Sequence, residues 1–504
     1  MEVREPPGPT VDVQTNPSVT VVGRERAAVR RDFGRLALVL LALTVFLRLP
    51  AFFVDVFNSD ETFLATQAQV IRDGGDLYRE AADRKPPLVP YVYAATFAIT
   101  GTTALWSVRV MAMLAVLATA LLLAFEARRR AGPRAMWIAG FLTVVALVAF
   151  APQDGQAANF EIFMLPTMVA AVVLARRGHG TAAGVAAAFA TLAKQTGAAV
   201  LLPVGYLLWK RRGRNGIADA VAGFLVPILL VAMWFGPRQI AHWTVLGNGS
   251  YVGLDTASAL VIAMFVLMTI GWAACNIPIL WTLPRSWRAR REAADDGDTN
   301  TDLWLWLASG AVSVAIGLRF FGHYYLQLVP PLVLLAAIAL SRASQRAMKV
   351  TIAFALVSGV MFSAAGYFLK PFGPEPQYRS VSRYIETHSS IDDRVLVWGN
   401  VPEIYWASDR LPATRYLTTT GFLGGYQPGR SEADPGADRD QKAWTWFYRD
   451  LEAHPPRYIV DTAPAQVRDA QRAPIDEFPR LRRYVKDHYR QIRTIDGFRL
   501  YERT

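Results

Sequence analysis

Apolar and polar positions alternate in long blocks, rather than residue by residue, over most of this 504-residue chain. An apolar helix of about 20 residues crosses the ~30 Å hydrocarbon layer of a membrane. The blocks therefore predict an α-helical polytopic membrane protein with about 11–13 transmembrane helices. The candidate spans are 33–54, 104–125, 135–151, 160–175, 181–194, 197–209, 216–236, 258–283, 302–320, 322–340 and 348–368.

Basic segments between the apolar blocks predict the orientation of the chain, because cytoplasmic loops carry the excess of Lys and Arg. These segments share one side with the N-terminus if there are eleven spans and Pro86–Thr100 does not cross. They are 128–134, 175–180, 210–216, 285–291 and 341–349. We therefore expect a multi-pass plasma-membrane protein with a cytoplasmic N-terminus. The outer face then carries the loops 55–103, 152–159 and 237–257 and everything after residue 370.

The chain divides into three parts by composition. Residues 1–32 are rich in proline, threonine and charge, which predicts a disordered cytoplasmic tail. No small-residue cleavage site follows the first apolar block, so we do not read the start of the chain as a signal peptide. The membrane domain is expected over residues 33–370, and an extracytoplasmic α/β domain over residues 371–504.

The expected α/β domain contains segments typical of strands and segments typical of helices. Its predicted strands are 394–399, 457–462 and 498–503. Its predicted helices are 378–388, 440–454 and a segment near 477–489. The polar stretch 424–440 predicts a long loop.

Composition narrows the function classes. Hydrophobic residues make up 53% of the chain and its mean hydropathy is +0.22, a balance typical of membrane proteins. The net charge of +12 is explained by the orienting loops, so no nucleic-acid partner is expected. The single Cys275 excludes a disulfide framework. No nucleotide-binding glycine motif, Gly-x-Ser-x-Gly elbow, or HxxxH or CxxC metal spacing occurs.

The loop 55–103 is the most polar part of the expected membrane domain, with seven carboxylates between Asp55 and Asp83. Asn58 is a good helix N-cap, and Glu61 follows three residues later, as in a capping box. Apolar residues then recur at helical spacing until Gly74-Gly75 ends the helix. This pattern predicts a helix that lies along the membrane surface.

Asp60, Glu61 and Lys85 are the first candidates for chemistry, and each has two interpretations. Carboxylates in a first helical turn stabilise the helix dipole by ~0.3–1 kcal/mol. Asp60 at the membrane surface is also suited to act as a general base for an acceptor hydroxyl. Lys85, followed by two prolines, either extends its charge to the interface or meets a phosphate or carboxylate there.

Further polar residues lie at the outer ends of spans. Glu161 is either an interfacial carboxylate or a functional one, because charged groups within a span are costly. Lys194 is either a second interfacial lysine or a phosphate contact, with Gln195 hydrogen-bonding nearby. Arg319, His323 and Tyr324 form either part of an aromatic belt or the lining of a sugar or lipid-phosphate pocket.

Taken in order, these motifs resemble one family. Asp60-Glu61 follows the first span, and GGDLY (74–78) and Lys85-Pro86-Pro87-Leu88 follow in the same loop. An acid at Glu161, a lysine at Lys194 and the sequence His323-Tyr324-Tyr325-Leu326 come later. This order is similar to that of the GT-C glycosyltransferases, in the branch of protein O-mannosyltransferases and lipid A aminoarabinose transferases. The resemblance covers roughly residues 33–340.

The resemblance implies a polyprenyl-phosphate-linked sugar as donor and transfer on the outer face to a glycan, lipid or protein acceptor. Asp60 matches the family's catalytic acid, which takes the acceptor proton, and Glu61 lies beside it. Lys85 matches the lysine that meets the donor phosphate, with help from Lys194 and His323. Glu161 takes the place of an acid that is often Asp, which leaves a divalent cation open as a cofactor.

Two other functions fit a polytopic chain of this kind. A transporter or flippase for lipid-linked sugars carries its polar groups near mid-bilayer on broken helices in matching halves. Here the polar candidates gather toward one face, and the sequence shows no repeat. A non-catalytic cell-envelope scaffold has no need for Asp60, Lys85 and Glu161 on one side.

Overall fold

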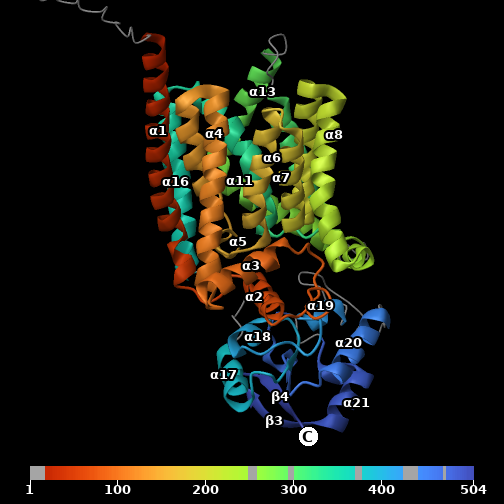
Figure 1. Cartoon of the computed structure of the whole chain (residues 1–504). Helices are drawn as coiled ribbons and strands as arrows, with labels where there is room; N and C mark the ends of the chain where they lie inside the picture. Colours follow the sequence, from red (N-terminus) through yellow and green to blue (C-terminus); the bar gives the residue numbers. More distant parts are fainter. Residues whose placement is uncertain (1–16, 248–257, 293–299, 369–376, 424–440, 469–472) are drawn as a thin grey trace, which may run out of the picture.

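The computed structural model describes residues 17–247, 258–292, 300–368, 377–423, 441–468 and 473–504. A bundle of long helices forms one part, and a smaller domain built from the C-terminal residues forms the other (Figure 1). The short helices α2 (Ser59–Arg72) and α3 (Leu88–Thr100) lie between them. The predicted polar loop 424–440 and the expected boundary near residue 370 fall outside the described residues.

The bundle is built from helices that bury a common apolar core. They are α1 (Pro17–Arg48), α4 (Leu105–Ala146), α6 (Phe160–Arg176), α7 (Gly180–Ala193), α8 (Leu201–Phe235), α11 (Ser258–Cys275), α12 (Ile277–Leu280), α13 (Leu283–Glu292), α14 (Thr301–Ala315), α15 (Val329–Ser341) and α16 (Gln345–Phe368). The outer surface of the bundle exposes many large apolar side chains, such as Phe46, Met233 and Ile270. Such a surface suits a lipid environment, as expected for a multi-pass membrane protein.

Two helices contain a break. α4 has non-helical residues at Ala131 and Gly132, next to Pro133, and α8 has one at Gly213. At 1.5 Å per residue, the 42 residues of α4 would form a helix about twice as long as the ~30 Å that a bilayer requires, so the break shows that α4 is not one straight span. In the described part of the chain, five helical segments are long and apolar enough to cross a membrane, or six with the bent pair α11 and α12–α13. The predicted count of eleven spans stays a prediction.

The first helix begins earlier than predicted. Residues 17–32 were expected in the disordered tail, but α1 starts at Pro17 and continues without interruption into the first apolar block. The segment before Phe33 contains four arginines and two alanines, which favour helix, and no proline follows Pro17 before Pro50. The helix therefore extends beyond the apolar block that identifies the span.

Short elements cover the end of the bundle that faces the C-terminal domain. They are η1 (Leu49–Phe52), α5 (Pro152–Gly155), η2 (Gln195–Val200), α9 (Pro237–Ile240), η3 (Ala241–Leu246) and η5 (Gly322–Leu328). α3 contains 13 residues, or about 20 Å of helix, which is too short to cross a bilayer. This length agrees with the expectation that Pro86–Thr100 does not form a span.

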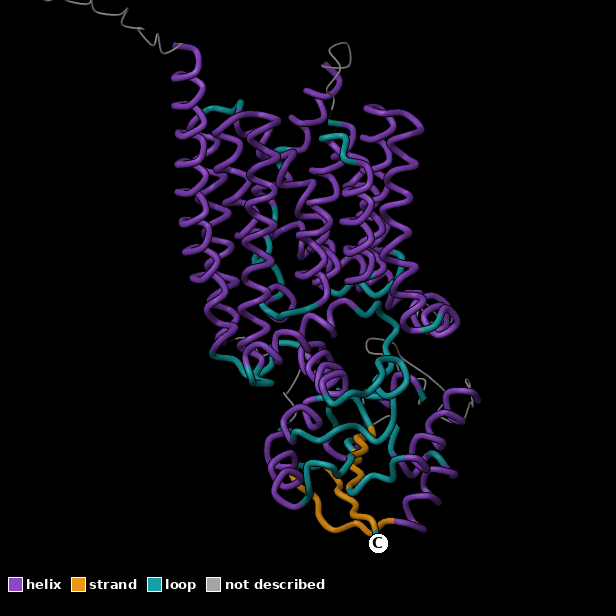
Figure 2. The backbone as a smooth tube through the Cα atoms, viewed as in Figure 1, coloured by secondary structure: helices purple, strands orange, loops and turns teal. Residues whose placement is uncertain are grey.

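The C-terminal domain has one four-stranded sheet in the order β1-β2-β4-β3. β1 (Val395–Trp398) runs parallel to β2 (Tyr458–Asp461), and β4 (Phe498–Arg503) pairs antiparallel with β2 and with β3 (Tyr489–Ile495). Figure 2 shows these strands together at the far end of the molecule. The surrounding helical elements are α17 (Tyr378–His388), α18 (Glu403–Ser408), α19 (Thr419–Phe422), α20 (Gln441–Ala453), η6 (Ala463–Ala465), η8 (Ile475–Glu477) and α21 (Pro479–His488).

Three strands match the predicted ones, but β3 was not predicted. Its sequence, YRQIRTI, buries only Tyr489, because β3 lies at the edge of the sheet. A strand with this exposure carries little of the apolar alternation by which strands are recognised. The predicted helix near 477–489 therefore ends at His488, and an edge strand follows it.

The C-terminal domain is anchored to the loop 55–103. The Trp406 indole donates a hydrogen bond to the Thr103 carbonyl at 2.9 Å, and the Gln69 amide donates to Asp409 at 2.8 Å. The Ala82 backbone N–H donates to the Arg415 carbonyl at 2.8 Å. The domain therefore holds the loop that contains the first candidate residues.

Candidate functional site

α2 presents its two adjacent carboxylates to different surroundings. Asn58 caps the helix, and its side chain accepts a hydrogen bond from the Asp60 backbone N–H at 3.0 Å, as the sequence predicted. Successive residues of an α-helix point about 100° apart, since one turn takes 3.6 residues. Asp60 therefore faces the partly open site, whereas Glu61 is fully buried.

Glu61 is held by groups that leave it no free acceptor site. Its two oxygens accept hydrogen bonds from Arg109 at 2.9 and 2.7 Å. They also accept from the backbone N–H groups of Phe57 at 3.1 Å and Ala158 at 3.0 Å. This geometry argues against the predicted catalytic role of Glu61. We assign it to positioning, because it ties α2 to α4 and to the segment before α6.

Asp60 and Lys85 form a looser pair. The Lys85 Nζ lies 3.7 Å from the Asp60 Oδ2, and their side chains remain 27% and 28% exposed. The same ammonium lies 4.1 Å from the centre of the Phe160 ring. Burial alone raises the pKa of Asp60, but the charges of Lys85, His323 and Lys194 more than offset this effect and lower it. Asp60 is therefore ionised at neutral pH.

Residues from four other elements complete this end of the bundle. Lys194 forms an ion pair with Glu161 at the start of α6. His323 on η5 reaches Asp154 on α5, with 2.5 Å between Nδ1 and Oδ1, and its Nε2 lies 3.9 Å from Glu161. The Lys194 ammonium also lies 4.0 Å from the centre of the Tyr324 ring. Glu161, Lys194 and His323, which are far apart in the sequence, therefore meet in one cluster.

Gln195 bonds to the protein backbone in the structure, and the role of Arg319 in substrate binding stays a prediction. The Gln195 amide donates to the carbonyls of Arg84 at 2.5 Å and Thr244 at 3.0 Å. In this state its amide nitrogen supports the backbone next to Lys85 and does not face a ligand. Arg319 is buried just before η5, in a segment where Leu318 and Phe320 have positive φ angles.

The structure adds residues that sequence reasoning did not select. Asp83 is buried two positions before Lys85, and its Oδ2 has no hydrogen-bond partner within the described residues. Burial raises the pKa of Asp83, and the Asp60 charge adds to this effect, although Lys85 opposes it. Arg48 and Arg109 lie inside apolar blocks. A charged residue in such a block is costly, so their positions could have marked them as structurally important from the sequence.

The charged groups at this end do not fit a metal site. Across the described residues, no three His, Cys, Asp or Glu side chains are arranged to hold a metal ion. Asp60 and Glu161 are each paired with a lysine, which competes with a cation for the same oxygens. We therefore derive no step that involves a divalent cation.

A second charge cluster lies at the opposite end of the bundle. Arg130 contacts Glu126 at 2.6 Å and Asp302 at 2.5 Å, and Arg176 contacts Glu126 at 3.2 Å. Arg176 ends the helix that Glu161 begins, so about 22 Å of helix separates the two clusters.

Comparison with known proteins supports the family resemblance that the sequence motifs indicated. Residues 84–237 match the family model described as dolichyl-phosphate-mannose-protein mannosyltransferase. No curated protein matches the sequence. The structure of ArnT from Cupriavidus metallidurans bound to undecaprenyl phosphate is similar at a TM-score of 0.61 and 15% identity, over 93% of this chain and 97% of that one.

Two archaeal structures share the fold at lower scores. The Archaeoglobus fulgidus oligosaccharyltransferase with zinc and sulfate gives a TM-score of 0.53 at 12% identity, over 93% of this chain and 73% of that one. The oligosaccharyltransferase AglB from the same organism, with an inhibitory peptide and dolichol phosphate, gives 0.51 at 12% identity, over 94% and 74%. The chain has the fold of the GT-C glycosyltransferases. The predicted family resemblance and the predicted fold class are thereby confirmed.

Proposed function

We propose that this protein transfers a sugar from a polyprenyl-phosphate donor to an acceptor hydroxyl, with Asp60 as the general base. The observation that carries the proposal is the partly exposed pair of Asp60 and Lys85, which lies beside the cluster of Glu161, Lys194 and His323. One carboxylate and several cations at one end of an apolar bundle suit removal of a proton and stabilisation of a departing phosphate.

The proposed reaction is a direct displacement. The acceptor oxygen gives its proton to the Asp60 carboxylate and forms a bond to the anomeric carbon. The bond between that carbon and the phosphate oxygen breaks, and its electron pair leaves with the lipid phosphate. Lys85, with Lys194 and His323 behind it, stabilises this charge in a site of low dielectric constant.

Donor binding also prepares the base in this scheme. A phosphate that approaches Lys85 competes with Asp60 for the ammonium, because their 3.7 Å pairing is loose and partly exposed. Loss of the lysine contact raises the proton affinity of Asp60, which improves a base whose pKa is otherwise lowered. Donor binding and activation of the acceptor are thereby coupled through one lysine.

The proposed reaction takes place on the outer face of the membrane. The site and the C-terminal domain lie at the same end of the bundle, whereas the basic helix α13 lies at the other end (Figure 1). Under the positive-inside rule, the end with α13 faces the cytoplasm. The acceptor is then a glycan, lipid or protein of the cell envelope.

Replacement of one carboxylate tests the proposal. Purified protein is incubated with a panel of polyprenyl-phosphate sugars and candidate acceptors, and the release of lipid phosphate is measured. We expect Asp60→Asn to lose about 10²–10⁴-fold in turnover, the usual contribution of a general base. Asp73→Asn, at the exposed C-cap of the same helix, is the matched control and should retain turnover. Equal turnover of Asp60→Asn and the parent would remove the base assignment.

A further inference from the structure

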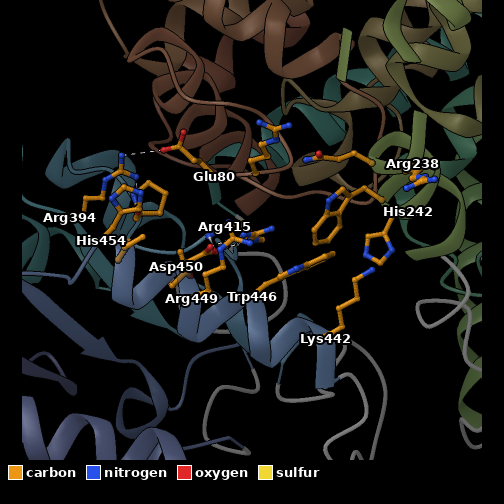
Figure 3. A pocket seen from close by; sticks show the side chains of 17 residues that line it. Glu80, Arg238, His242, Arg394, Arg415, Lys442, Trp446, Arg449, Asp450 and His454 are labelled. Atoms are coloured by element: carbon orange, nitrogen blue, oxygen red, sulfur yellow. Dashed lines mark hydrogen bonds and ion pairs between the residues drawn. The ribbon is translucent and has the colours of Figure 1, made fainter. Parts of the chain in front are cut away.

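A cavity of about 520 Å³, lined by none of the candidate site residues, lies between the C-terminal domain and the end of the bundle. Arg238, His242 and Trp243 from α9 and η3 form one wall, and α20 of the C-terminal domain forms the opposite one (Figure 3). The loop after α2 closes a third side with Arg79 and Glu80. This volume falls within the range of small-molecule binding sites.

The lining of this cavity is strongly basic. Six Arg or Lys side chains and two carboxylates contribute to it. Both carboxylates are already paired, Glu80 with Arg394 at 3.2 Å and Asp450 with Arg415 at 2.7 Å. Within the described residues, Arg238 and Arg449 have no carboxylate within ion-pair distance. The cavity therefore has positive charge in excess, which suits a ligand with several anionic groups.

Aromatic rings hold part of this charge in place. Arg415 and Lys442 lie 4.9 and 4.7 Å from the centre of the Trp446 ring. The rings of His242 and Trp243 pack against the same indole, at centroid distances of 5.2 and 5.7 Å. Cations fixed against an aromatic surface lose less freedom when they bind an anion.

The cavity is linked to the Asp60 site through named contacts. The ring of Phe422 lies 6.1 Å from that of Trp243 and 4.2 Å from the Arg84 guanidinium carbon. Gln195 binds the carbonyls of Arg84 and Thr244, which neighbour Lys85 and Trp243 in the sequence. A molecule in the cavity therefore lies beside the loop that carries Lys85.

We propose that this cavity binds the anionic part of an acceptor saccharide, one that carries carboxylate or phosphate groups. The inference rests on the proposed function, since a transferase of this kind must hold its acceptor near Asp60. Arginine pairs with carboxylate and phosphate through two parallel hydrogen bonds, which fits both anions.

An extended peptide finds no strand edge to pair with in this cavity. The outer edge of β1 is already occupied, because Val395 exchanges backbone hydrogen bonds with Leu411 and Ala413. Pro412 and Ala413, which line the cavity, belong to this paired segment. Recognition in the cavity therefore depends on side-chain charge and not on addition of a strand.

Calorimetric titration of the purified full-length protein tests the proposal. The probes are trigalacturonate, which carries three carboxylates, and a hexose bisphosphate, with maltotriose as the neutral sugar and triglutamate as the acidic peptide. We expect salt-sensitive binding of at least one anionic sugar and none of maltotriose. Arg449→Glu and Arg238→Ala should each weaken this binding about tenfold or more, as on loss of a charged hydrogen bond.

Lys486→Glu is the matched control for Arg449→Glu. Both residues are exposed, both lie on helices of the C-terminal domain, and both substitutions change the charge equally. Equal weakening by the two variants, binding of triglutamate as tight as that of the sugars, or no binding of any probe would overturn the proposal. Because titration needs no turnover, such a failure is distinct from normal turnover in Asp60→Asn, which would overturn only the transferase assignment.

Discussion

The two charge clusters at opposite ends of the bundle are built differently. At the end far from the C-terminal domain, Arg130 lies between Glu126 and Asp302 at 2.6 and 2.5 Å, and only 1–3% of each side chain is exposed. At the other end, Asp60 and Lys85 are 3.7 Å apart and keep more than a quarter of their side chains exposed. The Arg130 cluster satisfies its charges internally, whereas the pair of Asp60 and Lys85 can exchange partners with a ligand.

This difference separates charges that hold the fold from charges that do chemistry. A buried ion pair adds little net stability, but removal of one partner leaves a costly uncompensated charge. A partly exposed pair is inexpensive to open, because water replaces the lost contact. Glu61 and Asp60 show the same contrast within one helical turn, since Glu61 is saturated by Arg109 and backbone N–H groups.

The largest effect on stability is expected at the buried cluster of Arg130, Glu126 and Asp302. Arg130→Ala leaves Glu126 and Asp302 buried without their cation and should lower the free energy of unfolding by ~3–5 kcal/mol. Thermal unfolding in detergent measures this loss, and turnover per folded molecule should be retained. Arg129→Ala, at the exposed neighbouring position, is the control. Equal stability of the two variants would contradict a structural role for this cluster.

At the pair of Asp60 and Lys85, we expect a large effect on turnover and a small effect on stability. Lys85→Ala should reduce turnover by about 10²–10³-fold, as on loss of one electrostatic contact to the transition state. Its cost in stability should stay below about 1 kcal/mol, since the pair is partly exposed. Lys85→Arg keeps the charge and should restore part of the turnover. If the alanine variant consumes donor as fast as the parent, Lys85 does not contact the phosphate.

The smallest effect is a change in pH dependence. A general base must be ionised, so activity falls as the pH drops through its pKa. In the parent, the pKa of Asp60 is lowered below the usual value of about 3.9, so turnover should not fall on its account between about pH 8 and pH 5. In Lys85→Ala the effect of burial is less opposed, and the acid limb of kcat/KM should move to higher pH. Superimposable profiles would contradict the coupling between Lys85 and Asp60.

Local patterns predicted much of the fold and of the site. The Asn58 cap and three of the four strands were predicted because each depends on a short run of residues. The edge strand β3 was missed because it buries only Tyr489. The early start of α1 was missed because polar helix formers precede the apolar block.

Roles that depend on distant partners were beyond the sequence. Asp60 and Glu61 are adjacent carboxylates in one helical turn, so the sequence alone does not separate their roles. The buried Arg109, 48 residues later, pairs with Glu61 and distinguishes the two. The basic cavity was not predicted, because Arg238 and Arg449 line one cavity only when the C-terminal domain packs against α9. Charge in such a site is set by docking and not by any local motif.

The hydrogen bond from Ala82 to the Arg415 carbonyl has a consequence for chimeric proteins. The Arg84 guanidinium also lies over the Phe422 ring. These two contacts join the segment before Lys85 to the C-terminal domain, more than 300 positions later in the sequence. Exchange of the C-terminal domain between relatives therefore has to carry residues 79–85 with it. A graft that separates them would remove the contacts that fix the segment before Lys85 to the C-terminal domain.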